Sequence, residues 1–98
     1  MTALDPVIHA DSRLRIMAAL AGLPAGDEVL FTRLRKDLSM TAGNLSTHLR
    51  KLEEAGYLTQ TKTIEGRTPA TYLSLTATGR AAYETYLTNL RTILEGNP

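Results

Sequence analysis

"TAGNLSTHLRKLEEAGYL", residues 41–58, is the stretch of sequence that decides the fold. It predicts a helix, because Leu45, Leu49 and Leu52 recur at helical spacing and form one apolar side. We expect Thr41 to cap this helix with its hydroxyl oxygen. The first half contains no Asp or Glu, although the positive end of a helix dipole favours acidic residues. It carries small polar residues and then two basic ones instead: Thr41, Gly43, Asn44, Ser46, Thr47, Arg50 and Lys51.

Length and composition indicate one domain of ordinary globular character. The chain has 98 residues, of which 43% are apolar and 21% are charged. It contains no cysteine, so it can form neither a disulfide framework nor a thiolate zinc site. No signal peptide is visible, and no apolar run approaches the roughly 20 residues that span a bilayer. We therefore expect a soluble protein of the cytoplasm, and the residues indicate no cofactor.

The charge is unevenly distributed along the chain, although the net charge is only +1. Residues 32–72 contain seven basic and four acidic residues, whereas the remainder contains four basic and six acidic ones. A basic middle between acidic ends is typical of a protein that presents one surface to a polyanion. The excess is small, and a solvated surface can also carry it.

The rest of the sequence predicts four further elements around the quoted helix. An apolar stripe with helical spacing follows Ser12, and the Gly and Pro of residues 22–28 end that first helix. A second short helix is expected from Thr32. After the quoted helix the hydrophobic period changes to two, which predicts a β-hairpin around the loop EGRTP, residues 65–69. A last helix is expected from its cap at Thr76 to about Leu94.

The order helix, helix, turn, helix, hairpin, helix resembles that of winged helix-turn-helix transcriptional regulators, close to the single-domain MarR-like and ArsR-like groups. The resemblance covers nearly the whole chain and depends on NLSTHLRKLEEAGYL (44–58), EGRTPATYLSLT (65–76) and TATGRAAY (76–83). It implies a mainly α fold with a small β-hairpin. A three-helix core and its wing would occupy residues 1–75 of this single domain, and a C-terminal dimerisation helix would occupy residues 76–98.

The resemblance also implies that the third helix enters the major groove of double-stranded DNA, where its first residues meet base edges. Small side chains there allow close approach. Gly43 could serve that approach or pack tightly against the preceding helix, and His48 could contact DNA or lie at the edge of the apolar stripe. Arg67 resembles a wing arginine, with a flexible loop charge as the alternative. The expected DNA-binding residues are Thr41, Gly43, Asn44, Ser46, Thr47, His48, Arg50, Lys51, Lys62, Arg67 and Thr68.

The last helix carries more apolar residues than one face of so small a body requires. Part of them must pack on the first helix of the same chain. The resemblance implies that the others pair with the same helix of a second copy, which would present two recognition helices to successive major grooves. The expected dimerisation residues are Tyr83, Tyr86, Leu87, Leu90, Ile93 and Leu94.

These features predict a homodimeric regulator, expected to repress, that binds a pseudo-palindromic DNA site. Any inducer would have to bind between the last helix, the first helix and the winged domain. An enzyme is not expected, because His9 and His48 have no Asp or Cys at a suggestive spacing. Two alternatives stay open. One is a winged-helix module that binds protein and not DNA, and the other is an ArsR-type metal or ligand sensor, for which His9 and Asp11 are a thin ligand set.

Overall fold

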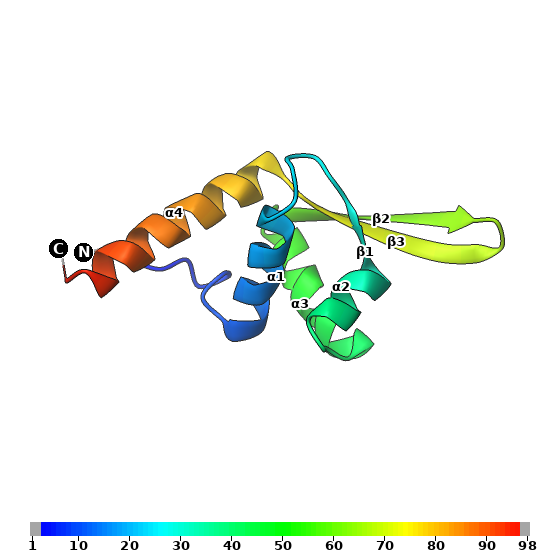
Figure 1. Ribbon diagram of the computed structural model, residues 1–98, viewed down its shortest axis with the longest axis horizontal. Coiled ribbons are helices and arrows are strands. Elements are labelled where there is room, and N and C mark those ends of the chain that lie inside the picture. The colour runs from blue at the N-terminus through cyan, green and yellow to red at the C-terminus, as the bar shows by residue number, and fades with distance from the viewer. Residues whose placement is uncertain (1–2, 97–98) are drawn as a thin grey trace.

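The computed structural model describes residues 3–96 and shows a helical body with two projections. The hairpin projects from one end of this body and the last helix from the other (Figure 1). The extents are 54 × 25 × 21 Å, and the radius of gyration is 14.4 Å. A compact chain of about 100 residues would have a radius near 13 Å, so the projections lengthen the molecule. The elements are α1 (Asp11–Ala21), β1 (Val29–Leu30), α2 (Phe31–Asp37), α3 (Ala42–Glu54), β2 (Leu58–Glu65), β3 (Thr68–Leu75) and α4 (Ala77–Leu94).

The core lies where α1, α2 and α3 meet the root of the sheet. Leu45, Leu49 and Leu52 of α3 are all fully buried, as their spacing predicts. Burying a leucine side chain stabilises a fold by about 1.5 to 3 kcal/mol, so this side of α3 is strongly held inward and the opposite side is left in solvent. The other buried members are Ile8, Ile16, Met17, Leu20, Leu34, Leu58, Leu73 and Tyr86.

The sheet contains the predicted hairpin and one additional strand. β2 and β3 pair in antiparallel register from Leu58↔Leu75 to Glu65↔Thr68. Only Gly66 of the two loop residues has positive φ, +63°, as in a type II′ turn. β1 pairs with β3 on its other side, which gives the order β1-β3-β2. β2 is therefore an edge strand.

Both predicted helix caps are present. Thr41 Oγ1 accepts a hydrogen bond from the backbone N–H of Asn44 at 3.1 Å, and Thr76 Oγ1 accepts one from the N–H of Gly79 at 2.9 Å. Each hydroxyl satisfies a donor that has no partner within its own helix. The caps fix the starts of α3 and α4 at the expected residues.

The start of α4 is joined closely to the turn between α3 and β2. The Thr76 hydroxyl donates to the carbonyl oxygen of Gly56 at 2.6 Å, and the Thr76 N–H donates to the carbonyl oxygen of Tyr57 at 3.1 Å. Gly79 lies so close to this turn that a Cβ atom there would be 1.9 Å from the Tyr57 oxygen. Glycine is therefore required at position 79 for the two segments to meet.

The segment before α1 is held against α4 and against the turn that follows α3. The Tyr57 hydroxyl donates a short hydrogen bond to the Asp5 carboxylate, and this bond is the main reason that the pKa of Tyr57 is raised to about 12. Asn89 Nδ2 of α4 donates to the carbonyl oxygen of Ala3 at 3.0 Å. These contacts make residues 3–10 part of the folded body.

The apolar residues of α4 divide between the core and the surface. Tyr86, expected at the dimerisation face, is only 2% exposed and lies in the core of its own chain. Its hydroxyl is 2.8 Å from Nδ1 of His9. A side chain buried in this way does not add to the surface that a second copy could contact. Ile93 and Leu94 are 46% and 75% exposed, and Tyr83, Leu87 and Leu90 are partly buried at the edge of the core.

Candidate nucleic-acid interface

The first half of α3 is open to solvent. Its core-facing leucines turn the opposite side outward, and no acidic residue occupies its first turn. Polar and basic side chains therefore surround a helix end whose free N–H groups and dipole favour anions. The exposed residues are Thr41, Gly43, Asn44, Ser46, Thr47, Arg50 and Lys51.

Gly43 is not required by packing within the described chain. A Cβ atom at this position would meet no other atom within 4 Å, leaving aside its own helix backbone and chain neighbours. The alternative that Gly43 packs tightly against the preceding helix is therefore excluded for this fold. Alanine would favour the helix by up to about 1 kcal/mol. Of the two explanations considered for Gly43, the open space is compatible only with close approach by a partner such as DNA.

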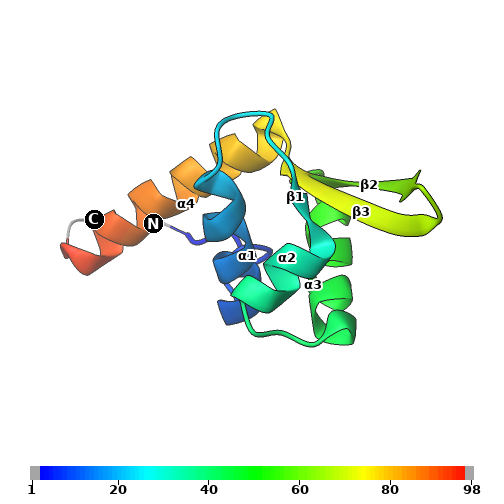
Figure 2. The ribbon, with the colours of Figure 1, turned by 45° about the vertical axis from the view of Figure 1, so that its right-hand side comes forward.

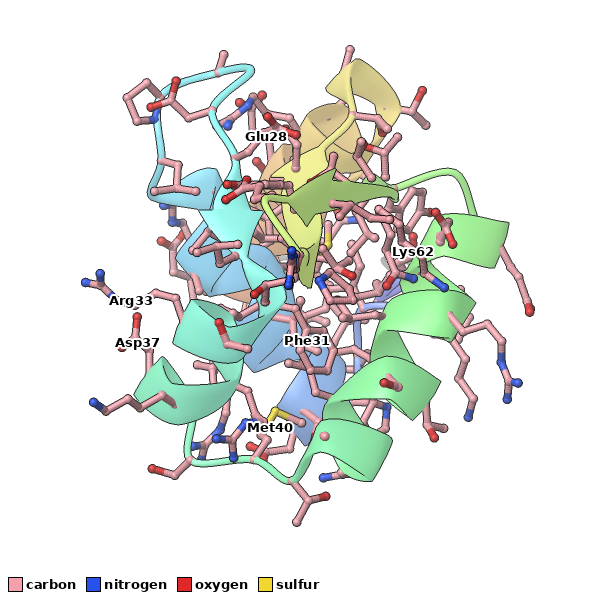
Figure 3. All side chains as sticks on the ribbon, turned by 90° about the vertical axis from the view of Figure 1, so that its right-hand side faces the viewer. Glu28, Phe31, Arg33, Asp37, Met40 and Lys62 are labelled. Carbon is pink, nitrogen blue, oxygen red and sulfur yellow. The ribbon has the colours of Figure 1, made fainter. Side chains whose placement is uncertain are left out.

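A groove of about 490 Å³ runs between α3 and the inner face of the hairpin. Arg50 of α3 and Lys62 of β2 supply its basic side chains. Lys62 reaches the groove because alternate residues of a strand share one face, and Leu58 of the same strand points inward to the core. In Figure 3, Phe31 lies between α2 and α3, and Lys62 lies on the side of α3. The groove is lined by Phe31, Ser46, Arg50, Glu53, Gln60, Lys62 and Thr71.

Four of these lining residues were not among the predicted site residues: Phe31, Glu53, Gln60 and Thr71. The alternation of side chains along a strand could have pointed to Gln60, which is two residues from Lys62 and so lies on the same face. The position of Thr71 depends on the register of the hairpin, in which Thr71 pairs with Lys62. Helical spacing could have pointed to Glu53, which shares one face of α3 with Ser46 and Arg50 at i, i+4 and i+7. Phe31 reaches the groove only through tertiary packing, for which the sequence carries no local signal.

Arg50 is weakly restrained. Its Nε atom is 3.9 Å from a carboxylate oxygen of Glu54, one helical turn further along α3, and both side chains are largely exposed. An exposed pair with this spacing contributes a few tenths of a kcal/mol. The guanidinium group can therefore leave Glu54 for a stronger anionic partner.

The tip of the hairpin carries Arg67 and Thr68, both exposed. The hairpin extends well beyond the three helices (Figure 2). Ile64, opposite Pro69 in the register, is 74% exposed close to this tip. The predicted residues thus form three groups: those on α3, Lys62 of β2, which shares the groove with Ser46 and Arg50, and Arg67 and Thr68 at the distant tip.

His48 is turned toward α1. Its Nδ1 atom is 3.2 Å from Nη1 of Arg13, and Arg13 Nε also donates to the carbonyl oxygen of Val7 at 2.6 Å. Partial burial lowers the pKa of His48, and the positive charges of Arg13 and Lys51 lower it further. His48 therefore favours the neutral form, in which Nδ1 can accept a hydrogen bond from Arg13.

An NMR titration should place the pKa of His48 below its ordinary value of 6.5. Because the unfolded chain binds this proton more readily, the contribution to stability is complete above pH 6.5 and is lost as the pH falls through the folded pKa. Adding a DNA duplex should raise the pKa if His48 lies near phosphates, since negative charge favours the imidazolium. An unchanged midpoint would place His48 outside the interface. Arg13→Met tests whether the positive charge of Arg13 lowers the pKa of His48, and this variant should raise that pKa in the absence of DNA.

No three His, Cys, Asp or Glu side chains between residues 3 and 96 lie close enough together to hold a metal ion. In the same range, no helix combines the length and apolar character needed to cross a membrane. Of the two residues considered for a metal, His9 contacts Tyr86 and Asp11 pairs with Arg15 at 3.2 Å.

The three-helix body, its hairpin wing and the open end of α3 define a winged-helix DNA-binding protein. Residues 12–94 match the family described as "Winged helix DNA-binding domain", and the chain belongs to this family. Its fold and family are those of a DNA-binding transcriptional regulator, and double-stranded DNA is its partner class.

Known proteins resemble the chain along most of its length. It is 40% identical over 82 residues to the uncharacterized protein MJ0432 of Methanocaldococcus jannaschii, and the match covers 83% of this chain and 85% of that protein. A transcriptional regulator homologue from Pyrococcus horikoshii OT3 superposes with a TM-score of 0.83 at 30% identity, covering 92% of this chain and 86% of that one. A PadR family transcriptional regulator from Eggerthella lenta shares the fold, with a TM-score of 0.68 at 22% identity over 88% of this chain and 83% of that one.

Proposed function

We propose that this protein is a cytoplasmic, MarR-like repressor that binds a pseudo-palindromic operator as a homodimer. The observation that carries the proposal is the open, acid-free end of α3 beside a groove containing Arg50 and Lys62. Such a surface fits the major groove, which admits one α-helix, together with the phosphates that flank it. Binding of this kind would repress by blocking polymerase.

The proposed contacts follow the three groups of residues. On α3, Asn44, Ser46 and Thr47 would meet base edges, and the exposed Gly43 would let the backbone come close. Arg50 would bind guanine through two hydrogen bonds or bind a phosphate. The phosphate contacts would come from Lys51 at the flank of α3 and Lys62 in the groove. Arg67 and Thr68 would reach the minor groove or its phosphates from the tip of the wing.

The proposed dimer depends on the projecting half of α4. Ile93 and Leu94 are exposed there, and Leu87 and Leu90 lie beside them, only partly covered by their own chain. Pairing this surface with a second copy would remove apolar area from water, at about 25 cal/mol for each Å². A two-fold arrangement would place two α3 helices roughly 34 to 36 Å apart, in successive major grooves.

Binding to duplex DNA should fall steeply as salt increases. If Arg50, Lys51, Lys62 and Arg67 all meet phosphates in both subunits, a plot of log affinity against log salt should have a slope of roughly −7, because each phosphate contact contributes about −0.9. Titrations of a mixed-sequence duplex at several salt concentrations measure this slope. Retention that does not respond to salt would favour the protein-binding module.

Arg50→Ala should weaken binding to the selected operator by about 1 to 3 kcal/mol and relax the preference at one base position. Fragment selection followed by affinity measurements on single-base variants would detect both effects. An equal loss on every sequence would identify Arg50 as a phosphate contact instead. Arg33→Ala is the matched control, since Arg33 has the same spacing to its acidic partner, Asp37, at 3.2 Å. Arg33 points away from α3 (Figure 3) and should have little effect.

A further inference from the structure

Glu53 of α3 is bound to the wing through both carboxylate oxygens. One oxygen accepts a hydrogen bond from the backbone N–H of Gln60 at 3.1 Å, and the other accepts one from Gln60 Nε2 at 3.2 Å. Gln60 lies on β2, whose partner β3 is on the opposite side. The bond to the backbone thus occupies a donor on the open edge of the sheet.

The position of Glu53 is electrostatically unfavourable for a DNA-binding protein. It lines the same groove as Arg50 and Lys62, where a negative charge repels the phosphates that these basic side chains attract. Glu54, its neighbour on the same helix, has a carboxylate oxygen 3.9 Å from Nε of Arg50. Both carboxylate oxygens of Glu53 bind Gln60 of the wing, and within residues 3–96 no ion pair joins Glu53 to Arg50 or Lys62.

The length of the wing makes the position of its tip sensitive to the contact between Glu53 and Gln60. Each of its strands has eight residues, which makes the hairpin about 26 Å long at 3.3 Å per residue. Leu58 and Leu73 at its root are buried, whereas Lys62, Ile64 and Arg67 farther out are exposed. A small rotation at the root would therefore move Arg67 by a much larger distance. Gln60 lies opposite Leu73 in the register, at the outer end of this buried root, where a tether to α3 restricts that rotation.

We propose that Glu53 is a positioning residue that holds the wing at a fixed angle to α3, so that Arg67 and the helix contact one duplex together. This role rests on the proposed DNA-binding function. The acidic charge lowers the attraction of the groove for DNA, and the two hydrogen bonds keep the tip of the wing within reach of the backbone. Charge-assisted hydrogen bonds of this kind are stronger than neutral ones.

The test is a double-mutant cycle with the full chain and one mixed-sequence duplex at fixed salt. Arg67→Ala is combined with the wild-type background, with Glu53→Ala, which removes the tether, and with Glu53→Gln. The glutamine removes the charge, but its amide can accept from the Gln60 N–H and donate to the Gln60 side-chain oxygen. Glu54→Gln is the matched control, because it removes one charge from the same helix without changing the tether.

We expect Arg67→Ala to weaken binding in the wild-type, Glu53→Gln and Glu54→Gln backgrounds by similar factors. In the Glu53→Ala background the factor should be at least about threefold smaller, which lies within the usual range for residues that act together. Amide hydrogen exchange provides a readout without DNA. The Gln60 N–H should exchange faster in Glu53→Ala than in the wild type, with Tm little changed.

The outcomes separate this role from the proposed function. An equal effect of Arg67→Ala in all backgrounds, or no effect of it in the wild type, would overturn the role of Glu53 and leave DNA binding intact. Unchanged exchange at Gln60 in Glu53→Ala would also overturn it. A wild-type protein with no salt-dependent binding to the duplex would overturn the DNA-binding function itself.

Discussion

Gly79→Ala is expected to destabilise the protein by on the order of 3 kcal/mol, the upper range for forcing an extra carbon into a packed site. The new Cβ atom would lie 1.9 Å from the carbonyl oxygen of Tyr57 and 2.7 Å from its carbonyl carbon. These are backbone atoms and cannot turn aside as a flexible side chain would. Thermal unfolding should show a fall in Tm of more than about 10 °C for a domain of this size.

Gly43→Ala is the matched control for this prediction. It makes the same chemical change in another helix, at a position where a Cβ atom has open space. Alanine favours a helix over glycine by up to about 1 kcal/mol, so Tm should stay constant or rise. A Gly79→Ala protein as stable as the wild type would show that α4 can move away from Tyr57 at little cost.

Leu94→Glu and Leu90→Glu are each expected to convert the proposed dimer to monomers. A charge in an apolar interface between two copies must either be desolvated without a partner or keep the copies apart. Loss of the second subunit should reduce operator affinity by roughly two orders of magnitude or more, because linked binding sites gain that much from acting together. Sedimentation measures the mass, and a titration of the operator duplex measures the affinity.

Leu94 is the decisive position of the two. Its side chain is 75% exposed, so a glutamate there should leave the fold of the single chain unchanged, whereas Leu90 also packs against its own core. Thr88→Glu adds the same charge to the other side of α4 and should leave the mass and the affinity unchanged. Dimers that persist in both leucine variants would place the interface elsewhere.

The elements predicted correctly are those with local physical causes. The leucines of α3 repeat at helical spacing, Thr41 and Thr76 are suited to cap helices, and the Gly-Arg loop is suited to a hairpin. β1 was missed because its two residues, Val29 and Leu30, are too few to show a period. It forms only because β3 offers a free edge beside it.

The site was predictable where its residues belong to one helix and less so where several elements meet. The outward side of α3 follows from the inward leucines. The contact of Glu53 with Gln60 and the close approach of Gly79 to Tyr57 depend on how the wing and α4 pack. Periodicity also could not assign Tyr86, because the spacing that places an apolar residue on one face does not say whether its own chain or another copy covers that face.

The start of α4 is joined to the turn after α3, so the orientations of the two helices are coupled. The contacts of this junction are made by Gly56, Tyr57, Thr76 and Gly79. The 18 residues of α4 form an arm about 27 Å long, so a tilt of about 5° moves its far end by about 2 Å. Because Gly79 and Thr76 contact the turn that directly follows α3, we expect such a tilt to be transmitted to α3. In a two-fold dimer, a change in the angle at which the two α4 helices cross would therefore alter the spacing of the two α3 helices. A molecule that binds near α4 could change DNA binding in this way without touching the DNA-binding surface.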